Sequence, residues 1–444
     1  MAKHFSLKDL LRFTAPSVGG AVFVSIYGIV DGLFVSNCAG TTAFAAVNLI
    51  MPFIMILGTI GFMVGTGGSA LVGKARGEGD DERANRWFSL LVYASFAGGV
   101  VVAVLGAVFM RQVAAAFGAT GSMLDQCVLY GRLSMISLPA FILQFVFQSF
   151  SITAGKPKVG FAFTFASGVV NMVGDAVLVG ALGMGVAGAA WATVASELLG
   201  GFGPIAYFAS PNSSCLRLGR TRLEWRVIGR TCVNGSSEMM ANIAMSVVSI
   251  FYNLQLIAML GENGVAAYGV IMYVAMIFAS VFEGYALGSA PLMSYQYGAK
   301  NKAEMASLWR KGMAVVAVGG VAMLCAAQAG AGLLAWMFTG YDADLSQLTE
   351  HAFRLYSIAF ALMGFSMFGS SLFTSLNNGV VSAVISFVRS LVFEVGSVML
   401  LPCVLGTDGI WLSVVVAEVC SVTMTFAFMF GLGKNYGYLQ RPPR

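Results

Sequence analysis

Long apolar runs alternate with short polar breaks along the whole chain. Each run reaches the roughly 20 residues that an α-helix needs to cross a bilayer, given its rise of about 1.5 Å per residue. The runs begin near Phe13, Ala45, Trp87, Gly131, Val159 and Val186 and, after a polar break, near Val233, Gly264, Gly312, Ala352, Val380 and Gly409. The pattern therefore predicts an all-α integral membrane protein with 12 transmembrane helices.

Composition supports a protein whose solvent is lipid. Hydrophobic residues make up 58% of the 444 and charged residues 10%, whereas soluble domains carry about 25% charged residues. The net charge of +5 does not indicate nucleic-acid binding, because the basic residues fall in short loops between the apolar runs. The bilayer is the expected surrounding, and a monomer is the default expectation.

The loop positions of Lys and Arg predict the orientation. With a cytoplasmic N-terminus, the inner loops hold Lys3, Lys8, Arg12, Lys74, Arg76, Arg83, Arg86, Lys156, Lys158, Arg217, Arg220, Arg222, Arg226, Arg230, Lys300, Lys302, Arg310, Lys311, Lys434, Arg441 and Arg444. The outer loops hold Arg111, Arg132 and Arg354. This bias follows the positive-inside rule and predicts a multi-pass protein of the plasma (inner) membrane with both termini cytoplasmic.

A shift of 221 residues aligns the two halves of the chain. It pairs Glu197 with Glu418, and Gly77 with Gly298 in equivalent loops. An even number of spans returns the second half to the same side, so the repeats are parallel, as in transporters that rock one half against the other. We therefore predict an N-lobe (residues 1–215, spans 1–6), a cytoplasmic linker (residues 216–230) and a C-lobe (residues 231–444, spans 7–12).

No enzyme signature survives inspection. The near-match to a phosphate-binding loop that ends at Lys74 lacks the required Ser or Thr, since Ala75 follows. The glycines at 183, 185 and 188 match a dinucleotide fingerprint by letters alone, in a short turn with no preceding strand. Seven scattered cysteines without a CxxC pair, and only two histidines, argue against a disulfide framework or a zinc site. No cofactor is expected.

Ionisable residues inside the spans are the candidate functional residues, because a charge within hydrocarbon is costly and usually functional. They are Asp31, Asp175, Glu197, Glu238, Glu283, Arg389, Glu394 and Glu418. Asn171 and Asp175 are four residues apart, so a helix places them on one face. Two interpretations stay open for this face: a proton or cation site, and a neutral or paired acid that fixes helix packing.

The other acids leave more alternatives. Arg389 pairs either with Glu394 on its own span or with a neighbouring helix. Glu197 and Glu418 either share a packing role or act in transport. Glu238 either caps a helix or faces a central cavity, and the roles of Glu238, Glu283, Arg389 and Glu394 are not fixed by the sequence.

The order of several short motifs resembles that of the multidrug and toxic compound extrusion (MATE) transporters. These motifs are ThrAlaPro and ValAspGlyLeuPheValSer in span 1, AlaAlaValAsnLeuIleMetPro in span 2, GlyLysAlaArgGlyGluGlyAsp after it, and TyrGlyAlaLysAsn in the second half. The Asn-x3-Asp pattern of span 5 adds to the likeness, which is greatest for the branch named after the DNA-damage-inducible members. The resemblance implies an ion-coupling site in the N-lobe at Asp31, Asn171, Asp175 and Thr193, which binds H+ or Na+.

The resulting hypothesis is a secondary antiporter that exports amphipathic, cationic organic compounds by alternating access, in exchange for H+ or Na+. Ion binding would remove charge from the N-lobe cavity, bend span 1 near Pro16 and weaken the hold on the substrate. Residues expected to line the substrate cavity are Tyr27, Phe34, Phe141, Phe145 and Glu238. The alternative is a flippase for lipid-linked saccharides, which would need several cavity Arg or Lys, whereas only Arg389 lies well inside a span.

Overall fold

The computed structural model describes residues 4–34, 41–339 and 342–439, and within these it describes residues 29, 31–34, 41–45, 246 and 262 by their backbone alone. The described chain is helical and contains no strand. The first half consists of α1 (Leu7–Phe34), α2 (Thr41–Gly77), α3 (Asp81–Ala116), α4 (Gly121–Thr153), α5 (Pro157–Gly174), the π-helix η2 (Asp175–Ala181) and α6 (Gly185–Ala209). The expected all-α fold is confirmed.

The second half begins with α7 (Trp225–Gly298), which is two helices joined at Gly261. Gly261 has a φ of 63°, a conformation that residues with a Cβ rarely adopt. The following elements are α8 (Lys302–Thr339), α9 (Ala343–Tyr356), the 3-10 helix η3 (Ser357–Ala359), α10 (Phe360–Ser375), α11 (Gly379–Phe387), the π-helix η4 (Val388–Glu394), α12 (Val395–Leu400), α13 (Pro402–Leu405) and α14 (Thr407–Tyr436).

Within the described residues, 11 helical stretches are long and apolar enough to cross a membrane. Three of these spans contain more than one element: α5 with η2, α9 through α10, and α11 through α13. The twelfth predicted span is α6, which has 25 residues but falls short in hydropathy because it is rich in Gly and Ala and contains Glu197. Small residues suit close packing, and α6 packs along α4 and α5.

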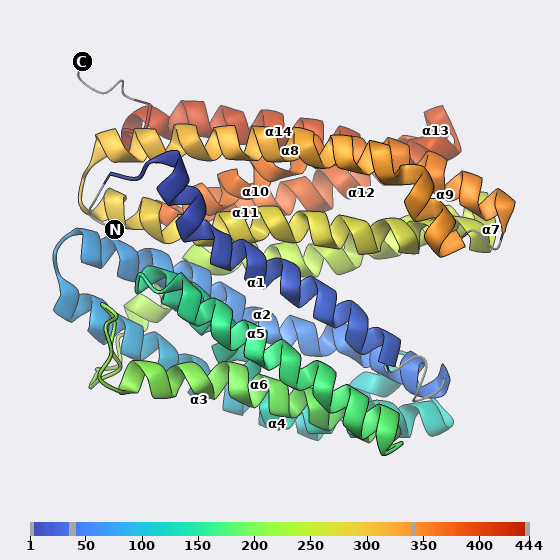
Figure 1. The fold of residues 1–444 in the computed structure, drawn as a ribbon, viewed down its shortest axis with the longest axis horizontal. Coiled ribbons are helices and arrows are strands. Elements are labelled where there is room, and N and C mark those ends of the chain that lie inside the picture. The colour runs from blue at the N-terminus through green and yellow to red at the C-terminus, as the bar shows by residue number, and fades with distance from the viewer. Residues whose placement is uncertain (1–3, 35–40, 340–341, 440–444) are drawn as a thin grey trace.

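Two clusters of buried apolar side chains divide the molecule. One is drawn from α2 to α6, and the other from α7 to α14. Figure 1 shows the corresponding helix groups lying side by side along their lengths. The exact boundaries predicted at residues 215 and 231 remain a prediction.

Helix α1 connects the two groups. Leu10 in its first turn, and Phe5 just before the helix, belong to the second cluster, while its later turns pack against α5. Glu304 of α8 holds the start of the chain, because one carboxylate oxygen accepts the backbone N–H of Phe5 at 2.9 Å and the other contacts His4. Pro16 lies within the helix at the point where the chain passes from one group to the other.

All the loops that carry clustered Lys and Arg lie at one end of the bundle, which we call the basic end. They follow α2, α4, α6 and the second helix of α7, and the described chain begins and ends there too (Figure 1). The Gly261 turn, the turn between η2 and α6, and α13 lie at the opposite end.

Candidate functional site

An open cavity lies between the two helix groups, and the space within its walls, open solvent included, is about 830 Å³. Its wall is built from α2, both helices of α7, α10, α11 and η4. The lining residues are Phe62, Thr66, Ser69, Ala70, Glu238, Ala241, Glu283, Ala286, Leu287, Ala290, Ser366, Met367, Ser370, Ser371, Thr374, Ser375, Ile385, Ser386 and Arg389. The mixture of apolar side chains and a few polar groups is typical of small-molecule sites.

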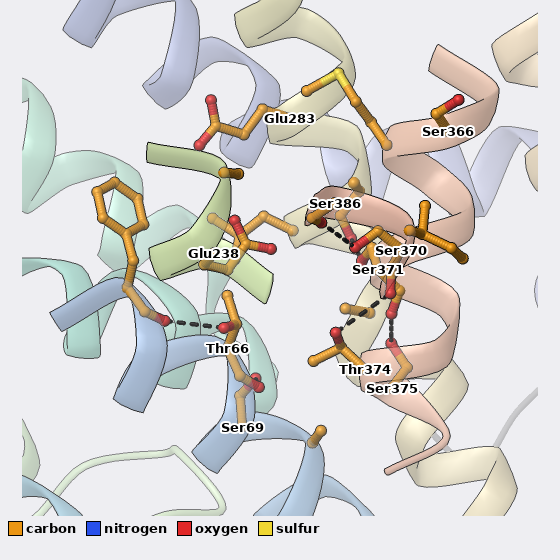
Figure 2. A pocket seen from close by; sticks show the side chains of 18 of the residues that line it. Thr66, Ser69, Glu238, Glu283, Ser366, Ser370, Ser371, Thr374, Ser375 and Ser386 are labelled. Atoms are coloured by element: carbon orange, nitrogen blue, oxygen red, sulfur yellow. Dashed lines mark hydrogen bonds between the residues drawn. The ribbon is translucent and has the colours of Figure 1, made fainter. Parts of the chain in front are cut away.

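Two glutamates supply the negative charge of this cavity. Glu238 lies on the first helix of α7 and is half-buried, whereas Glu283 lies on the second helix and is exposed. Figure 2 shows both carboxyl groups on one side of the space and the hydroxyl groups of α10 on the other. Neither glutamate has an ion-pair partner among the described residues, so the cavity carries an acidic wall available to a cation.

Hydroxyl groups cover the opposite wall. Ser370 Oγ lies 2.8 Å from Ser382 Oγ and 3.0 Å from Ser386 Oγ, and Thr374 Oγ1 lies 2.7 Å from Ser382 Oγ. These contacts connect α10 to two positions one turn apart on α11 (Figure 2). The network offers neutral donors and acceptors and holds the wall in a defined arrangement.

The one arginine on the wall is already paired. Arg389 Nε donates to Glu418 Oε1 at 2.9 Å, and Glu418 of α14 is only 3% exposed. Of the two pairings left open by the sequence, the structure therefore has the one with a neighbouring helix. Because the Glu418 carboxylate neutralises the Arg389 guanidinium, the arginine adds no unpaired positive charge to the cavity.

Close contacts join α2 to α7 beside the cavity and from there to the basic end. A Cβ on Gly67 of α2 would lie 2.7 Å from the backbone nitrogen of Gly235 in α7, and one on Gly77 would lie 2.7 Å from the nitrogen of Ala299. A Cβ on Gly235 would likewise overlap the backbone of Met63. Only glycine permits two backbones to approach this closely, so α2 and α7 seal the space between the lobes on this side.

The N-lobe acid site is built on the end of span 5. Asn171 and Asp175 are 3% and 0% exposed, and Asp175 is the residue at which α5 changes into the π-helix η2. The Asn171 Oδ1 atom is buried without a hydrogen-bond partner among the described residues. Single π-helical turns occur frequently at functional sites, so the local backbone is consistent with a site here.

Helix α1 packs against the same face of α5. A Cβ on Gly168, one turn before Asn171, would lie 2.8 Å from the ring of Tyr27. The two helices run in the same direction, because Gly19 lies near Phe161 and Tyr27 near Gly168. Asp31 is one turn beyond Tyr27 in α1, but its side chain lies outside the described residues, so its distance to Asp175 is not part of the structure.

Thr193 lies close to this site without a described contact to it. The Cβ of its neighbour Ala192 would lie 2.7 Å from a Cβ on Gly174, which precedes Asp175. The coupling assignment of these four residues remains a prediction, with Asn171, Asp175 and Thr193 placed within one region.

The expected substrate-cavity residues are distributed over three places. Glu238 lines the central cavity, and Tyr27 packs on α5. Phe141 is buried against α2, and Phe145 stacks on the wall residue Phe62 with ring centroids 3.8 Å apart. The side chain of Phe34 lies outside the described residues. Their role in substrate binding is a prediction that the structure leaves untested.

Sequence reasoning did not identify the hydroxyl wall. Ser366, Ser370 and Thr374 recur every four residues, and Ser371 and Ser375 repeat this spacing one position later. Such spacing places them along one strip of a helix, so the periodicity was the signal that could have revealed the wall.

Comparison with known protein families identifies the family of the chain. The MatE family profile matches residues 16–177 and 239–398. The chain belongs to the MatE family. Members of this family are membrane transporters, so this MatE chain is a transporter and not an enzyme.

Relatives of this MatE chain include multidrug export proteins MepA. It is 26% identical over 299 residues to MepA of Staphylococcus haemolyticus, a match that spans 67% of this chain and 66% of the relative. With MepA of Staphylococcus aureus it shares 25% identity over 321 residues, or 72% and 70% of the two chains.

The fold of this MatE chain is that of solved MATE transporters. A structure described as the outward-facing conformation of a multidrug resistance MATE family transporter of the MOP superfamily superimposes with a TM-score of 0.92, at 20% identity over 98% of this chain and 97% of that one. A MATE crystal structure in the bent conformation gives a TM-score of 0.88, at 21% identity over 97% of both chains.

Proposed function

We propose that this MatE chain is a secondary antiporter that exports amphipathic, cationic organic compounds across the plasma membrane in exchange for H+ or Na+. The observation that carries the proposal is the cavity between the lobes, whose two glutamates have no cationic partner among the described residues. The printed names of the relatives, multidrug export proteins, support the same class of substrate. A monomer with both termini cytoplasmic completes the proposal.

An organic cation in this cavity would meet carboxylate groups on one side and hydroxyl groups on the other. Glu238 and Glu283 supply the charge, while Phe62, Leu287 and Met367 supply an apolar and adaptable wall. The contacts of Gly67 and Gly77 with α7 close the basic end, so a substrate released from this arrangement leaves toward the opposite end. Alternating access then requires those contacts to open and reform.

The coupling ion is assigned to the N-lobe. The buried pair Asn171 and Asp175, with Thr193 and Asp31, supplies oxygen atoms that suit a proton or a hard cation such as Na+. The coupling between the two sites is reciprocal. If the bound ion lowers the affinity for substrate, bound substrate must lower the affinity for the ion by the same factor. This arrangement is what membership of the branch named after the DNA-damage-inducible members would imply, and that branch remains our proposal.

The flippase alternative is less well supported by the cavity. A pyrophosphate-linked saccharide would need free cationic groups, whereas the one arginine on the wall donates to Glu418. The remaining wall is acidic or neutral.

Transport of an ethidium-like dye by purified protein in liposomes tests the proposal, with a pH gradient and a Na+ gradient imposed separately. We expect one of the two gradients to drive dye movement. Asp175→Asn should abolish the response to the gradient while dye binding persists, and Asp31→Asn should do the same. Glu238→Gln should instead weaken dye binding. Gradient-driven transport that is unchanged in Asp175→Asn would refute the N-lobe assignment, and dye binding that is unchanged in Glu238→Gln would refute the cavity assignment.

A further inference from the structure

The linker between the lobes carries an unusual concentration of arginine. Residues 216–230 include Arg217, Arg220, Arg222, Arg226 and Arg230 but no lysine, and all five arginines are exposed. No carboxylate among the described residues lies within ion-pair distance of any of them. The one acidic residue of the linker, Glu224, is already engaged. The linker therefore presents positive charge that the described protein does not neutralise.

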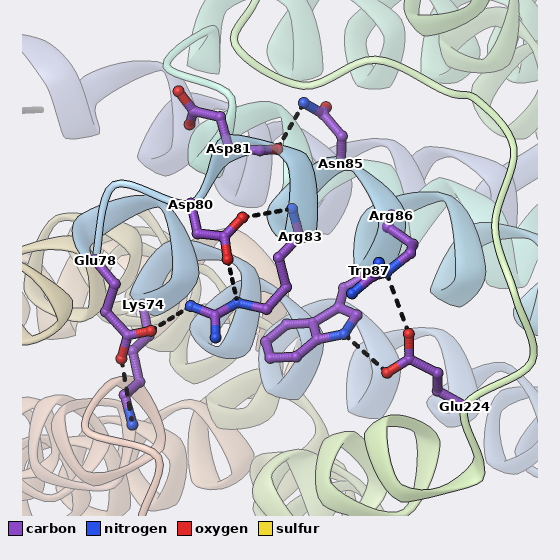
Figure 3. Close-up of polar contacts among 9 residues, drawn as sticks. All are labelled: Lys74, Glu78, Asp80, Asp81, Arg83, Asn85, Arg86, Trp87 and Glu224. Carbon is purple, nitrogen blue, oxygen red and sulfur yellow. Dashed lines mark hydrogen bonds and ion pairs between the residues drawn. The ribbon is translucent and has the colours of Figure 1, made fainter.

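Engagement of Glu224 is visible in Figure 3. Its two carboxylate oxygens contact Arg86 Nε at 3.2 Å and Trp87 Nε1 at 3.3 Å, both on the first turns of α3. Arg83 on the first turn of α3 forms separate ion pairs with Glu78 and Asp80, which lie in the turn before the helix. The acidic groups nearest the linker are thus occupied by N-lobe arginines rather than by linker arginines.

The backbone of the linker is fixed along α3. The Arg217 N–H donates to Asn85 Oδ1 at 2.7 Å, and the Gly219 N–H donates to Ser89 Oγ at 3.0 Å. The Thr221 hydroxyl donates to the Arg86 carbonyl at 2.9 Å. A chain held at three successive points displays its arginines in a defined row, so a multivalent ligand would find them already arranged.

This row lies where the lipid-facing side of α3 begins. The Tyr93 hydroxyl donates to the Gly219 carbonyl at 3.3 Å, and Tyr93 itself is 47% exposed. Further along α3, Phe96, Val100 and Val104 continue the exposed apolar stripe at helical spacing. Beside the arginines, Leu223 and Trp225 are 61% and 72% exposed. Large apolar side chains at such a border are typical of the membrane interface, where Trp is enriched.

We propose that the linker binds the phosphate-bearing headgroups of anionic phospholipids, with Leu223 and Trp225 inserted among the lipids. Guanidinium groups form paired hydrogen bonds to phosphate oxygens, and arginine clusters at the ends of spans attract anionic lipids. The apolar pair and the lipid-facing Tyr93 distinguish this surface from one that binds a soluble polyanion. The linker joins the lobes, so lipid bound here contacts the segment from which α7 begins.

Lipid binding to the purified full-length protein in nanodiscs tests the proposal, with phosphatidylglycerol titrated into phosphatidylcholine and bound lipid counted by native mass spectrometry. The triple variant R217Q/R220Q/R222Q should lose its preference for phosphatidylglycerol by on the order of 100-fold, because each basic residue near an anionic surface contributes about fivefold. The control K158Q/R310Q/K434Q removes the same number of exposed charges from the same end and should keep the preference. Equal loss in both variants would show a general charge effect and overturn the proposal.

A second measurement separates lipid from free phosphate. Brominated phosphatidylglycerol should quench part of the tryptophan fluorescence of the wild type, and W225F should remove that part. Millimolar inorganic phosphate should not displace the lipid. If phosphate displaces it fully, or if W225F leaves the quenching unchanged, the surface binds an anion without engaging the bilayer and the proposal fails.

Discussion

Substitution of Gly235 by alanine should open the basic end of the transporter. The new Cβ would lie 2.7 Å from the Met63 carbonyl carbon and 3.0 Å from its Cα, and closer still to the carbonyl oxygen. Favourable carbon–carbon contact needs about 3.5 Å, so α2 and α7 must separate by at least about 0.8 Å, and by more to clear the carbonyl oxygen. The obstacle is backbone, which cannot rotate away as a side chain does.

The magnitude follows from overpacking, which typically costs about 1–3 kcal/mol. The cost falls only on the conformation in which α2 and α7 touch, so the equilibrium between closed and open basic ends should shift about 5- to 150-fold, given about 1.4 kcal/mol for each factor of ten. The same helix offers a matched control, because a Cβ on Gly229 meets no atom within 4 Å. Gly229→Ala should leave the equilibrium unchanged.

Cysteine accessibility measures the shift. Ser69 lies on the cavity wall and is 3% exposed, so Ser69→Cys in a background without native cysteines reports on entry from the basic end. A membrane-impermeant thiol reagent added on that side should react faster in Gly235→Ala by a factor within the range above. Gly67→Ala, which places a Cβ 2.7 Å from the Gly235 nitrogen, should do the same. A labelling rate in both variants equal to that of Gly229→Ala would refute the glycine seal.

Three further predictions concern stability, measured as thermal unfolding of the purified protein in detergent. Arg389→Met should destabilise by about 3–5 kcal/mol because it leaves Glu418 buried and unpaired, whereas the double change to Met at both positions should be close to neutral; equal losses would contradict this account. Glu304→Ala should cost about 1–3 kcal/mol because the Phe5 N–H loses its acceptor, and no change would show that the segment before α1 is not held there. Gly406→Ala should cost about 1 kcal/mol or more, since its φ is 62°, and an unchanged melting temperature would contradict the strain.

The fold could be predicted from the sequence because span length and hydropathy are local properties. Apolar runs located eleven described spans directly, and the shift that pairs Gly77 with Gly298 indicated the repeat. The purpose of that glycine pair could not be predicted, because it depends on where α2 crosses α7. Gly298 meets the backbone of Lys74, and Gly77 meets that of Tyr295.

The site was predictable only in part, for a related reason. The four-residue spacing of Asn171 and Asp175 placed them on one face, and the structure buries both. The partner of Arg389 lies 29 residues away on α14, a distance at which sequence spacing carries no geometric information. To predict the hydroxyl wall at Ser370, one would have needed the helical spacing of its residues and also the fact that this face of α10 borders the space between the lobes.

The fifth span of each half contains a π-helical stretch, η2 after Gly174 and η4 after Phe387. A π-turn accommodates one residue more than an α-turn over the same length, so it acts as a dislocation in the helix lattice. Such a defect can migrate by one residue when neighbouring hydrogen bonds exchange partners, and the side chains it passes rotate by about 100° without any movement of the helix ends. Asp175 lies at the edge of one such defect. Displacement of η2 by one residue would therefore turn this carboxylate toward or away from α1 while both lobes stayed in place.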